Sequence, residues 1–450
     1  MASSFGTSLI SFFLTPIYTN VLKKGEMGII DLLEFSALLF FFIISLDFSD
    51  SVARYTLDDS LDKPMILKIG INFLFKSGSI VAGIIVILAV LNIFDWNLLY
   101  YFFLFIQYIF LSCNLLLTQY LKGIEKVKII AVASILSIAV RLIFVYLFLV
   151  YVKWGIAGYF VASFAGSFIS ILLYVCNITG FSNIFKIHVN KKIEKEMLIY
   201  SIPLAINAIG WWVAQGVDKY FVSYHFGYDL NGIYSVSYKI PSIISIMCNV
   251  FTSAFSISAV KELKDSHNQD FYKNTYTLFL SLLTVVCSFL IISNVFVTDF
   301  LFAEEYFDAW RYSSLLMVSS VFSGLGSYLG GLCDAFKKNK ILAVSTVVSA
   351  VINIVLNVIL IPRYAAVGAA VATIISMFFI YIIRFCYVEH FVKIHRYLML
   401  EILTFLLLLI QLISDQIGNH NYSIQCVLLV SIVLLQIPNC LIILRSGRKI

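Results

Sequence analysis

The chain alternates between apolar blocks of about 20 residues and short polar connections along its whole length. An α-helix of about 20 apolar residues crosses the hydrocarbon core of a bilayer, so each such block predicts one membrane-spanning helix. The pattern therefore predicts an all-α integral membrane protein with about fourteen transmembrane helices. They are expected at approximately residues 2–22, 29–50, 66–91, 98–118, 129–151, 155–178, 199–224, 233–257, 276–297, 312–332, 341–361, 367–387, 398–414 and 424–444.

Composition supports this class and excludes others. Of the 450 residues, 61% are hydrophobic and only 12% are charged, which leaves too few polar residues to cover a soluble protein of this size. The net charge of +6 does not indicate a nucleic-acid partner, because the basic residues lie in short loops between apolar blocks. The cysteines show neither a CxxC motif nor Cys/His ligand spacing, so we expect no metal site.

The distribution of Lys and Arg predicts the topology. With both termini in the cytoplasm, the cytoplasmic segments hold 22 basic residues, including Lys68 and Arg384 at inner helix ends, the external loops hold five and the spans hold four. Cytoplasmic loops of membrane proteins are enriched in Lys and Arg, so this bias favours that orientation.

The chain also repeats internally. Gly28-Ile29 corresponds to Gly232-Ile233, Lys128-Ile129 to Lys340-Ile341, and Gly158 to Gly368. The repeat predicts two six-helix bundles with the same orientation, related by an axis along the membrane normal. We expect bundles at residues 1–190 and 191–390, followed by two additional transmembrane helices at 391–450.

Polar residues follow one face of two predicted helices at equivalent places in the repeats. The first helix carries Ser4, Ser8, Ser11, Thr15 and Tyr18, and the eighth carries Ser235, Lys239, Ser242, Asn249, Ser253 and Ser256, at steps that keep each set mostly on one side. Helix packing through small polar residues is the alternative interpretation. It explains the first face well, but it does not account for Lys239.

Charges inside the spans provide the candidate site. A charged side chain at mid-bilayer costs about 2.5–3.5 kcal/mol, so Lys76, Arg141, Lys219 and Lys239 are expected to face water or partners, unless their long side chains snorkel to the interface. A cavity between the bundles that is rich in cations and hydroxyl groups would suit an anionic substrate such as a phosphate. The residues expected to line this cavity are Arg54, Lys76, Arg141, Asp218, Lys219, Lys239, Ser242 and Asn249.

The acidic residues nearest to these cations are Asp47 and Asp218. Each is a candidate either for a salt-bridge partner or for a coupling site for H⁺ or Na⁺. No other cofactor is expected.

Several segments resemble a known family. They are LISFFLTPIYTNVLKKGEMGIIDLLEF at residues 9–35, LDFSDSVARYTLDD at 46–59, AVRLIFVYLF at 139–148, VDKYFVSYHFGYDLNGIYSVSYKIP at 217–241 and NIVLNVILIPRYAAVGAAVATIIS at 353–376. This combination resembles the polysaccharide biosynthesis, or O-antigen and teichoic-acid repeat-unit, flippase family. The resemblance covers the first twelve spans and implies a fold related to multidrug extruders and the lipid II flippase. The family's intramembrane charges correspond to Arg54, Arg141, Asp218, Lys219 and Lys239.

The resemblance implies a flippase that carries undecaprenyl-diphosphate-linked oligosaccharide repeat units across the bacterial cytoplasmic membrane, not an enzyme. Its partners would be the lipid-linked oligosaccharide, membrane lipids and the polysaccharide polymerase machinery. One alternative is a multidrug or cation antiporter of the same fold, although its cavity should be acidic. The other is a membrane-embedded glycan polymerase, for which the longest external loop, about residues 298–311, is short.

Overall fold

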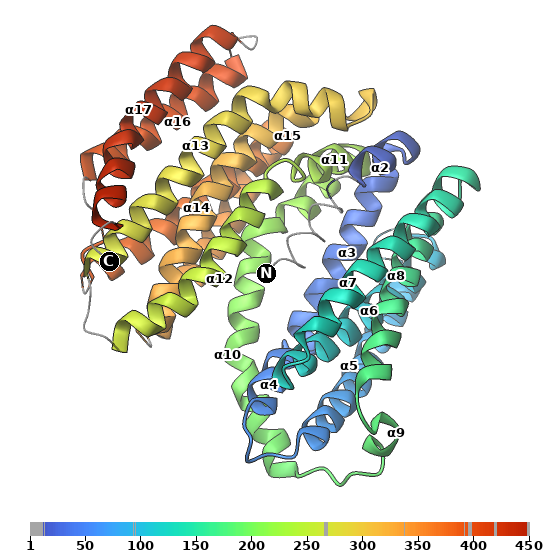
Figure 1. Cartoon of the computed structure of the whole chain (residues 1–450). Coiled ribbons are helices and arrows are strands. Elements are labelled where there is room, and N and C mark those ends of the chain that lie inside the picture. Colours follow the sequence, from blue (N-terminus) through green and yellow to red (C-terminus); the bar gives the residue numbers. More distant parts are fainter. Residues whose placement is uncertain are drawn as a thin grey trace. The chain divides into compact units, whose positions relative to one another are not determined.

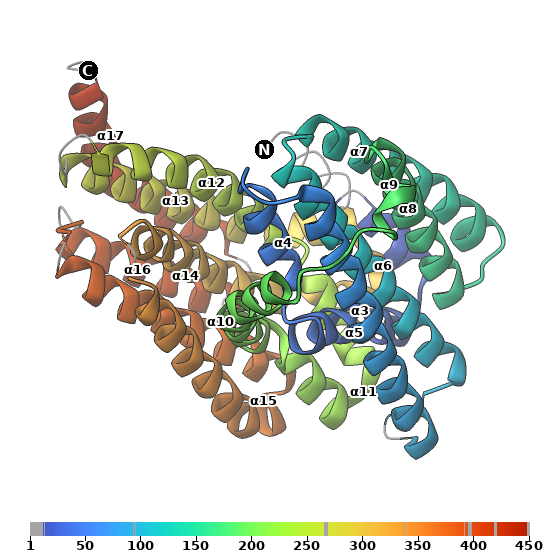
Figure 2. The ribbon, with the colours of Figure 1, turned by 90° about the horizontal axis from the view of Figure 1, so that it is seen from below.

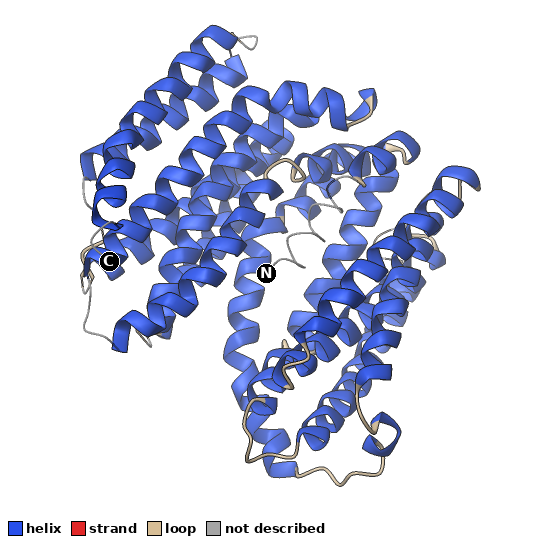
Figure 3. Cartoon of the chain, in the orientation of Figure 1, coloured by secondary structure: helices blue, strands red, loops and turns tan. Residues whose placement is uncertain are grey.

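The computed structural model describes residue 12 and residues 14–447, except 93, 95, 265–268, 337, 391, 395–397 and 418–420. Ser4, Ser8 and Ser11 of the first polar face lie outside the described residues. Throughout the described part, the chain forms helices joined by loops and turns (Figure 3). It divides into two compact units between Trp212 and Val213.

The N-terminal unit is a bundle of helices (Figure 1). Its elements are α2 (Thr15–Val21), α3 (Lys24–Ile44), α4 (Phe48–Thr56), α5 (Lys63–Leu91), α6 (Leu98–Gly123), α7 (Val127–Phe144), a π-helical turn (Val145–Tyr151), α8 (Ile156–Asn177), α9 (Phe181–Ile184) and most of α10 (Lys191–Gly216).

Local signals explain where several of these helices begin. The Glu26 carboxylate accepts a hydrogen bond from the Lys23 N–H at 2.9 Å at the start of α3, and Asn97 accepts from the Leu99 N–H at the start of α6. The single helix expected at 29–50 is interrupted, because Leu46 and Asp47 have left-handed φ angles of 50° and 46°. Asp47 is therefore a hinge residue between α3 and α4.

The interior of this unit is apolar where α4 meets its neighbours. Phe48 of α4 stacks on Phe73 of α5 with ring centroids 4.3 Å apart. Val52 and Leu121 are fully buried in the same cluster. Within its own unit, α4 packs mainly against α6 and α5, and Figure 2 shows it beside α6. By contrast, α7 exposes most of its apolar side chains, as expected for a helix that faces lipid.

The C-terminal unit contains the remaining helices. They are α11 (Asp218–Ser237), α12 (Ser242–Lys264), α13 (Gln269–Leu301), a 3₁₀ turn (Glu304–Tyr306), α14 (Ala309–Ala335), α15 (Asn339–Glu389), α16 (Leu398–Ile417) and α17 (Tyr422–Gly447). The central helix is α14, most of whose side chains are buried by its neighbours.

The described residues include ten helices long and apolar enough to cross a membrane. Two of these stretches, Lys191–Ser237 and Lys340–Glu389, have 47 and 50 residues, about twice the length of one crossing. Each is broken by a residue with positive φ, Gly227 and Ala365 respectively. The chain is thus a multi-pass, all-helical membrane protein, while the expected number of fourteen spans stays a prediction.

The internal repeat is visible in the backbone at one pair of turns. Gly155, before α8, has φ 55° and ψ −131°, and Ala365, in the middle of α15, has φ 50° and ψ −136°. Three residues later, Gly158 and Gly368 pack against backbone carbonyls, because an added Cβ would lie 2.9 Å from Phe148 O and 2.5 Å from Leu360 O respectively. The matched glycines of the sequence repeat therefore mark the same tight turn in both units.

The last two helices are attached to α13 by buried polar side chains. Ser281 donates to Gln436 Oε1 at 2.6 Å, and Ser288 donates to Gln411 Oε1 at 2.7 Å. Gln436 in turn donates to Thr404 Oγ1 at 2.9 Å. These contacts make α16 and α17 part of the C-terminal unit. The expected bundle boundaries at residues 190 and 390 stay predictions, and the compact units divide later than the first of them, inside α10.

Candidate functional site

A polar network lies around Arg141 in the N-terminal unit. The Arg141 guanidinium donates to the Tyr159 hydroxyl at 3.0 Å, and this hydroxyl donates to Glu34 Oε1 at 2.8 Å. The Arg141 Cζ also lies 6.0 Å from the centroid of the Tyr18 ring. The network therefore joins four helices: Tyr18 belongs to α2, Glu34 to α3, Arg141 to α7 and Tyr159 to α8.

The close approach of α8 to α7 positions Arg141. A Cβ on Gly166 would lie 2.7 Å from Ser137 O and 3.1 Å from the Arg141 Cβ. Glycine is therefore needed where α8 passes over the helical turn that ends at Arg141. Tyr159, two turns earlier on α8, then reaches the guanidinium.

The network is electrically balanced but not saturated. Tyr159 separates a guanidinium from the Glu34 carboxylate, and its ring lies 5.3 Å from the Arg141 Cζ. Within the described part of the chain, Arg141 Nε is buried and has no hydrogen-bond partner. Buried donors are usually satisfied, so this nitrogen has hydrogen-bonding capacity that the described residues do not use.

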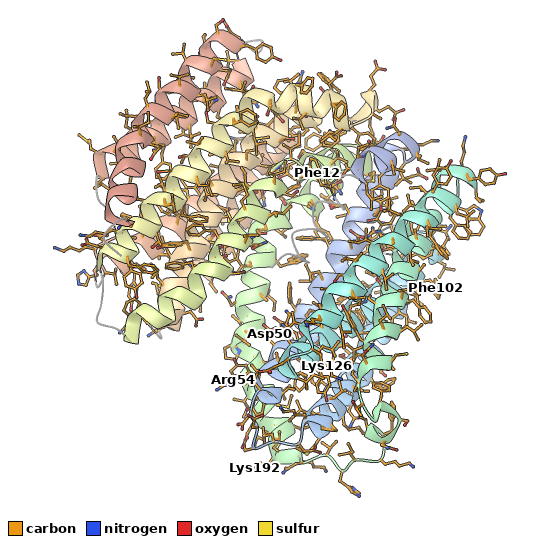
Figure 4. The ribbon with its side chains drawn as sticks, viewed as in Figure 1. Phe12, Asp50, Arg54, Phe102, Lys126 and Lys192 are labelled. Carbon is orange, nitrogen blue, oxygen red and sulfur yellow. The ribbon has the colours of Figure 1, made fainter. Side chains whose placement is uncertain are left out.

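The other candidates in this unit are not brought into contact with Arg141. Arg54 is exposed in the last turn of α4, and Lys76 on α5 pairs with Glu194 of α10 at 2.7 Å. Asp47 accepts a hydrogen bond from Ser49 at 3.2 Å. In Figure 4, Arg54 lies toward the same end of the unit as the labelled Lys126 and Lys192. The cavity-lining roles of Arg54 and Lys76 stay predictions.

Asp218 is the centre of a second network, in the C-terminal unit. It is fully buried at the start of α11. Its Oδ2 accepts hydrogen bonds from Tyr234 at 2.5 Å, Tyr238 at 3.2 Å and Thr373 at 3.1 Å. Its Oδ1 accepts from the Lys219 N–H at 3.0 Å. A carboxylate at a helix N-terminus is stabilised by the helix dipole and these donors together.

Further polar side chains continue from this network along α15. The Ser376 hydroxyl donates to Thr373 O at 3.0 Å, and Asn353 Nδ2 donates to Ser376 Oγ at 3.1 Å. Asn357 then donates to Asn353 Oδ1 at 2.8 Å. These side chains join the two limbs of α15 on either side of Ala365. Asp218 thus belongs to a buried path of carboxylate, hydroxyl and amide groups.

The remaining candidates of this unit lie around the junction of α11 and α12. The Lys219 ammonium lies 4.9 Å from the centroid of the Tyr238 ring, and Lys239 is half-buried. Ser242 donates to Lys239 O. Asn249 is exposed on α12, where its backbone carbonyl accepts from Ser253 at 2.6 Å. Lys219 and Asp218 are adjacent, but the Asp218 side chain is held mainly by hydroxyl groups.

Sequence reasoning missed two charged residues. Glu34 is absent from the predicted site, which assigns Asp47 and Asp218 as the acidic residues nearest to the cations, although a carboxylate within the apolar block at 29–50 is itself a signal. Arg384 is likewise absent from the predicted site, although it lies within the apolar block expected at 367–387. In the structure the Arg384 side chain is 2% exposed. Its guanidinium donates hydrogen bonds of 2.9 Å to Ser345 Oγ, Gly326 O and Thr346 Oγ1.

Metal ligation is not indicated in the described residues, where His, Cys, Asp and Glu side chains form no group of three or more. What the two networks offer chemically is hydrogen bonding and charge. The Arg141 network presents a guanidinium donor. The Asp218 network presents carboxylate and hydroxyl oxygens.

Comparisons with known proteins identify the family. A family model described as polysaccharide biosynthesis protein matches residues 1–257, more than half of the chain. The capsular polysaccharide biosynthesis protein CapF of Staphylococcus aureus is 26% identical over 200 residues, covering 43% of this chain and 50% of CapF. The probable low-salt glycan biosynthesis flippase Agl15 of Haloferax volcanii is 22% identical over 207 residues, covering 45% and 44%. The chain spans about half the length of these curated relatives.

Solved structures share the fold over most of the chain. The lipid II flippase MurJ in an inward closed conformation has a TM-score of 0.70 at 15% identity and covers 97% of both chains. An inward-facing multidrug resistance transporter of the MATE family has a TM-score of 0.64 at 12% identity, covering 86% of this chain and 94% of that one. With this fold and with more than half of its length matched by the family model, the chain belongs to the polysaccharide biosynthesis protein family.

Proposed function

We propose that the protein is a flippase for undecaprenyl-diphosphate-linked oligosaccharide repeat units. It works by alternating access in the bacterial cytoplasmic membrane, with both termini in the cytoplasm. The head group enters past Arg54, Lys76 and Arg141 of the N-terminal unit and leaves past Lys219 and Lys239, with Ser242 and Asn249 as polar contacts. The prenyl tail stays in lipid. The named relatives in polysaccharide and glycan biosynthesis support this substrate class.

The observation that carries the proposal is the Arg141 network. A guanidinium inside a membrane span is energetically costly, and such residues usually mark functional sites. Tyr159 and Glu34 hold it in place, while Nε is left without a partner among the described residues. Guanidinium groups bind phosphate oxygens through two parallel hydrogen bonds. Arg141 is therefore suited to receive one end of a diphosphate.

The test is a flipping assay with the purified protein in proteoliposomes. A lipid-linked oligosaccharide with a fluorescent sugar is placed in both leaflets, and a lectin added outside reports the fraction that becomes accessible. Arg141→Ala should reduce flipping by about tenfold or more, since a charge-assisted hydrogen bond contributes about 1.5–3 kcal/mol. Arg141→Lys separates the need for charge from the need for the planar guanidinium.

Arg363→Ala is the matched control. Arg363 is an exposed arginine on the first limb of α15, outside both networks, and its replacement should leave flipping unchanged. Equal flipping by wild type, Arg141→Ala and Lys239→Ala, at equal protein density, contradicts the proposed site.

The proposal includes ion coupling at Asp218. Hard cations such as Na⁺ prefer oxygen ligands, and Asp218 lies among the hydroxyl oxygens of Tyr234, Tyr238 and Thr373. A proton is the other candidate, and Asp47, at the α3–α4 hinge, is the other candidate residue. Imposing a Na⁺ gradient and a pH gradient separately on the proteoliposomes distinguishes the ions.

Asp218→Asn should abolish the stimulation of flipping by one of the two gradients. The slow flipping in the absence of a gradient should remain. Asp47→Asn is the comparison variant in the other unit. If Asp47→Asn abolishes the stimulation and Asp218→Asn does not, Asp47 is the coupling residue instead. Insensitivity of the wild-type protein to both gradients overturns the coupling.

A multidrug or cation antiporter of the same fold is the second candidate. One observation favours it. The Glu34 carboxylate belongs to the same network as Arg141, so this network carries a negative as well as a positive charge. An organic cation would bind the Glu34 carboxylate, so Glu34→Gln would then abolish ethidium efflux. The flippase proposal expects no ethidium efflux from wild-type vesicles.

A polymerase is disfavoured by the short external segment. Only the residues between Leu301 and Ala309, including a single 3₁₀ turn, connect α13 to α14. This leaves little chain for an external catalytic site. We propose a transport protein without enzymatic activity, which passes its cargo to the polysaccharide polymerase machinery.

A further inference from the structure

A groove runs along α15 in the C-terminal unit, and none of the residues that line it belongs to the Asp218 network. Its volume is about 810 Å³, and its walls include Ile341 and Val348 from the first limb of α15 and Phe379 and Ile382 from the second. Lys338 and His390 also line it. We call this feature the α15 groove.

The two basic residues of the lining, Lys338 and His390, lie at one end of the α15 groove. Lys338 directly precedes α15 and His390 directly follows it, and the helix reverses direction at Ala365. Val348 and Phe379 lie ten and eleven residues farther into their limbs. At 1.5 Å per residue this corresponds to roughly 15–17 Å, about half of the roughly 30 Å hydrocarbon core. The apolar part therefore matches the depth of one leaflet.

The charge at this end favours an anion. Lys338 and His390 are both exposed. The neighbouring acidic residue Glu389 is engaged locally, because its carboxylate accepts a hydrogen bond from the Ile394 N–H at 3.0 Å. Basic pockets between membrane helices bind the head groups of anionic lipids. A zwitterionic lipid would bring its own ammonium group toward Lys338 and bind less well.

We propose that the α15 groove is a binding site for an anionic phospholipid of the surrounding bilayer. Its phosphate lies between the Lys338 ammonium and the His390 imidazole, and one acyl chain lies along Ile341, Val348, Phe379 and Ile382. The site is separate from the proposed transport path, and its test requires no transport.

The experiment uses the full chain in nanodiscs of phosphatidylcholine. A small fraction of phosphatidylglycerol carries a photoreactive diazirine on one acyl chain, and cross-linked peptides are mapped by mass spectrometry. Cross-links should concentrate on the apolar walls of the α15 groove. A double variant, Lys338→Gln with His390→Gln, should reduce them about fivefold or more, as expected for the loss of a basic contact to an anionic lipid.

Lys340→Gln is the matched control, because Lys340 is an exposed lysine at the same end of α15 that is not among the residues lining the groove. It should leave the cross-links unchanged. Ile382→Trp should remove cross-links from the groove by filling it, while the unfolding temperature stays within the range of other surface variants.

Three outcomes overturn the proposal. The double variant could cross-link as strongly as wild type, or diazirine-labelled phosphatidylcholine could label the groove as strongly as phosphatidylglycerol. A prenyl diphosphate could also displace phosphatidylglycerol at equal concentration, which would assign the groove to the lipid carrier instead.

Discussion

The Tyr159 hydroxyl joins Arg141 to Glu34, accepting from the guanidinium at 3.0 Å and donating to the carboxylate at 2.8 Å. The hydroxyl thus carries the contact between opposite charges on α7 and α3.

Removing this hydroxyl should loosen Arg141 without removing its charge. We expect Tyr159→Phe to lower the free energy of unfolding by about 1 kcal/mol, the scale of a hydrogen bond inside a membrane protein, and to slow flipping. Chemical denaturation in detergent measures the first effect. Tyr146→Phe, at a tyrosine that is 69% exposed, should change neither quantity. If both variants behave like wild type, Tyr159 does not position Arg141.

The contact between α7 and α8 should tolerate no methyl group at Gly166. An added Cβ would approach Ser137 O to 2.7 Å, so we expect Gly166→Ala to destabilise the protein by about 1–3 kcal/mol. Gly83→Ala is the control, because its Cβ would meet no described atom within 4 Å, and alanine is the better helix former. Thermal unfolding of both variants gives the comparison, and equal midpoints would contradict the close packing.

The backbone at Ala365 should favour glycine. Its φ of 50° and ψ of −136° place a Cβ where only glycine is unstrained. Ala365→Gly should therefore stabilise the protein by about 1 kcal/mol. Ala366→Gly, one residue later in a buried helical position, should destabilise it by about as much. A loss of stability in Ala365→Gly would show that the turn is not strained.

The role of Lys76 can be separated from that of its partner. Lys76 pairs with Glu194 at 2.7 Å, with a side chain that is 63% exposed, so the pair contributes only about 0–1 kcal/mol. If Lys76 acts by holding α10, either single charge reversal should slow flipping, and the combination Lys76→Glu with Glu194→Lys should restore it. Failure of the exchanged pair, together with normal flipping in Glu194→Gln, would assign Lys76 to substrate contact.

Local patterns in the sequence predict the helices well. The span expected at 155–178 is α8 at Ile156–Asn177, because a block of apolar residues between polar connections fixes both ends of a membrane helix. The break at Leu46 and Asp47 could not be predicted this way. It depends on the φ angles of two residues, not on the hydrophobicity of the segment.

The site was predictable only in part, because its contacts join distant parts of the chain. Arg141 stands out as a charge in an apolar block. Its link to Glu34 through Tyr159 depends on how α3 and α8 are rotated about their axes, which the sequence does not specify. In the same way, Thr373 lies 155 residues from Asp218. Helical periodicity places each residue on a face but does not say which faces meet.

The attachment of the last two helices has a consequence for synthesis. Ser281 and Ser288 precede Gln436 and Gln411 in the chain by 155 and 123 residues, so α13 leaves the ribosome long before its partners. Until then, the Ser281 hydroxyl can donate within its own helix, to Thr277 O at 2.8 Å. The glutamine side-chain amides take hydrogen-bond partners from other helices, and polar groups without such partners are costly in hydrocarbon. The helices of the C-terminal unit that precede α16 can therefore insert before α16 and α17 at little energetic cost. By contrast, α16 and α17 must pack against α13 as they insert, so that their glutamine amides are hydrogen-bonded.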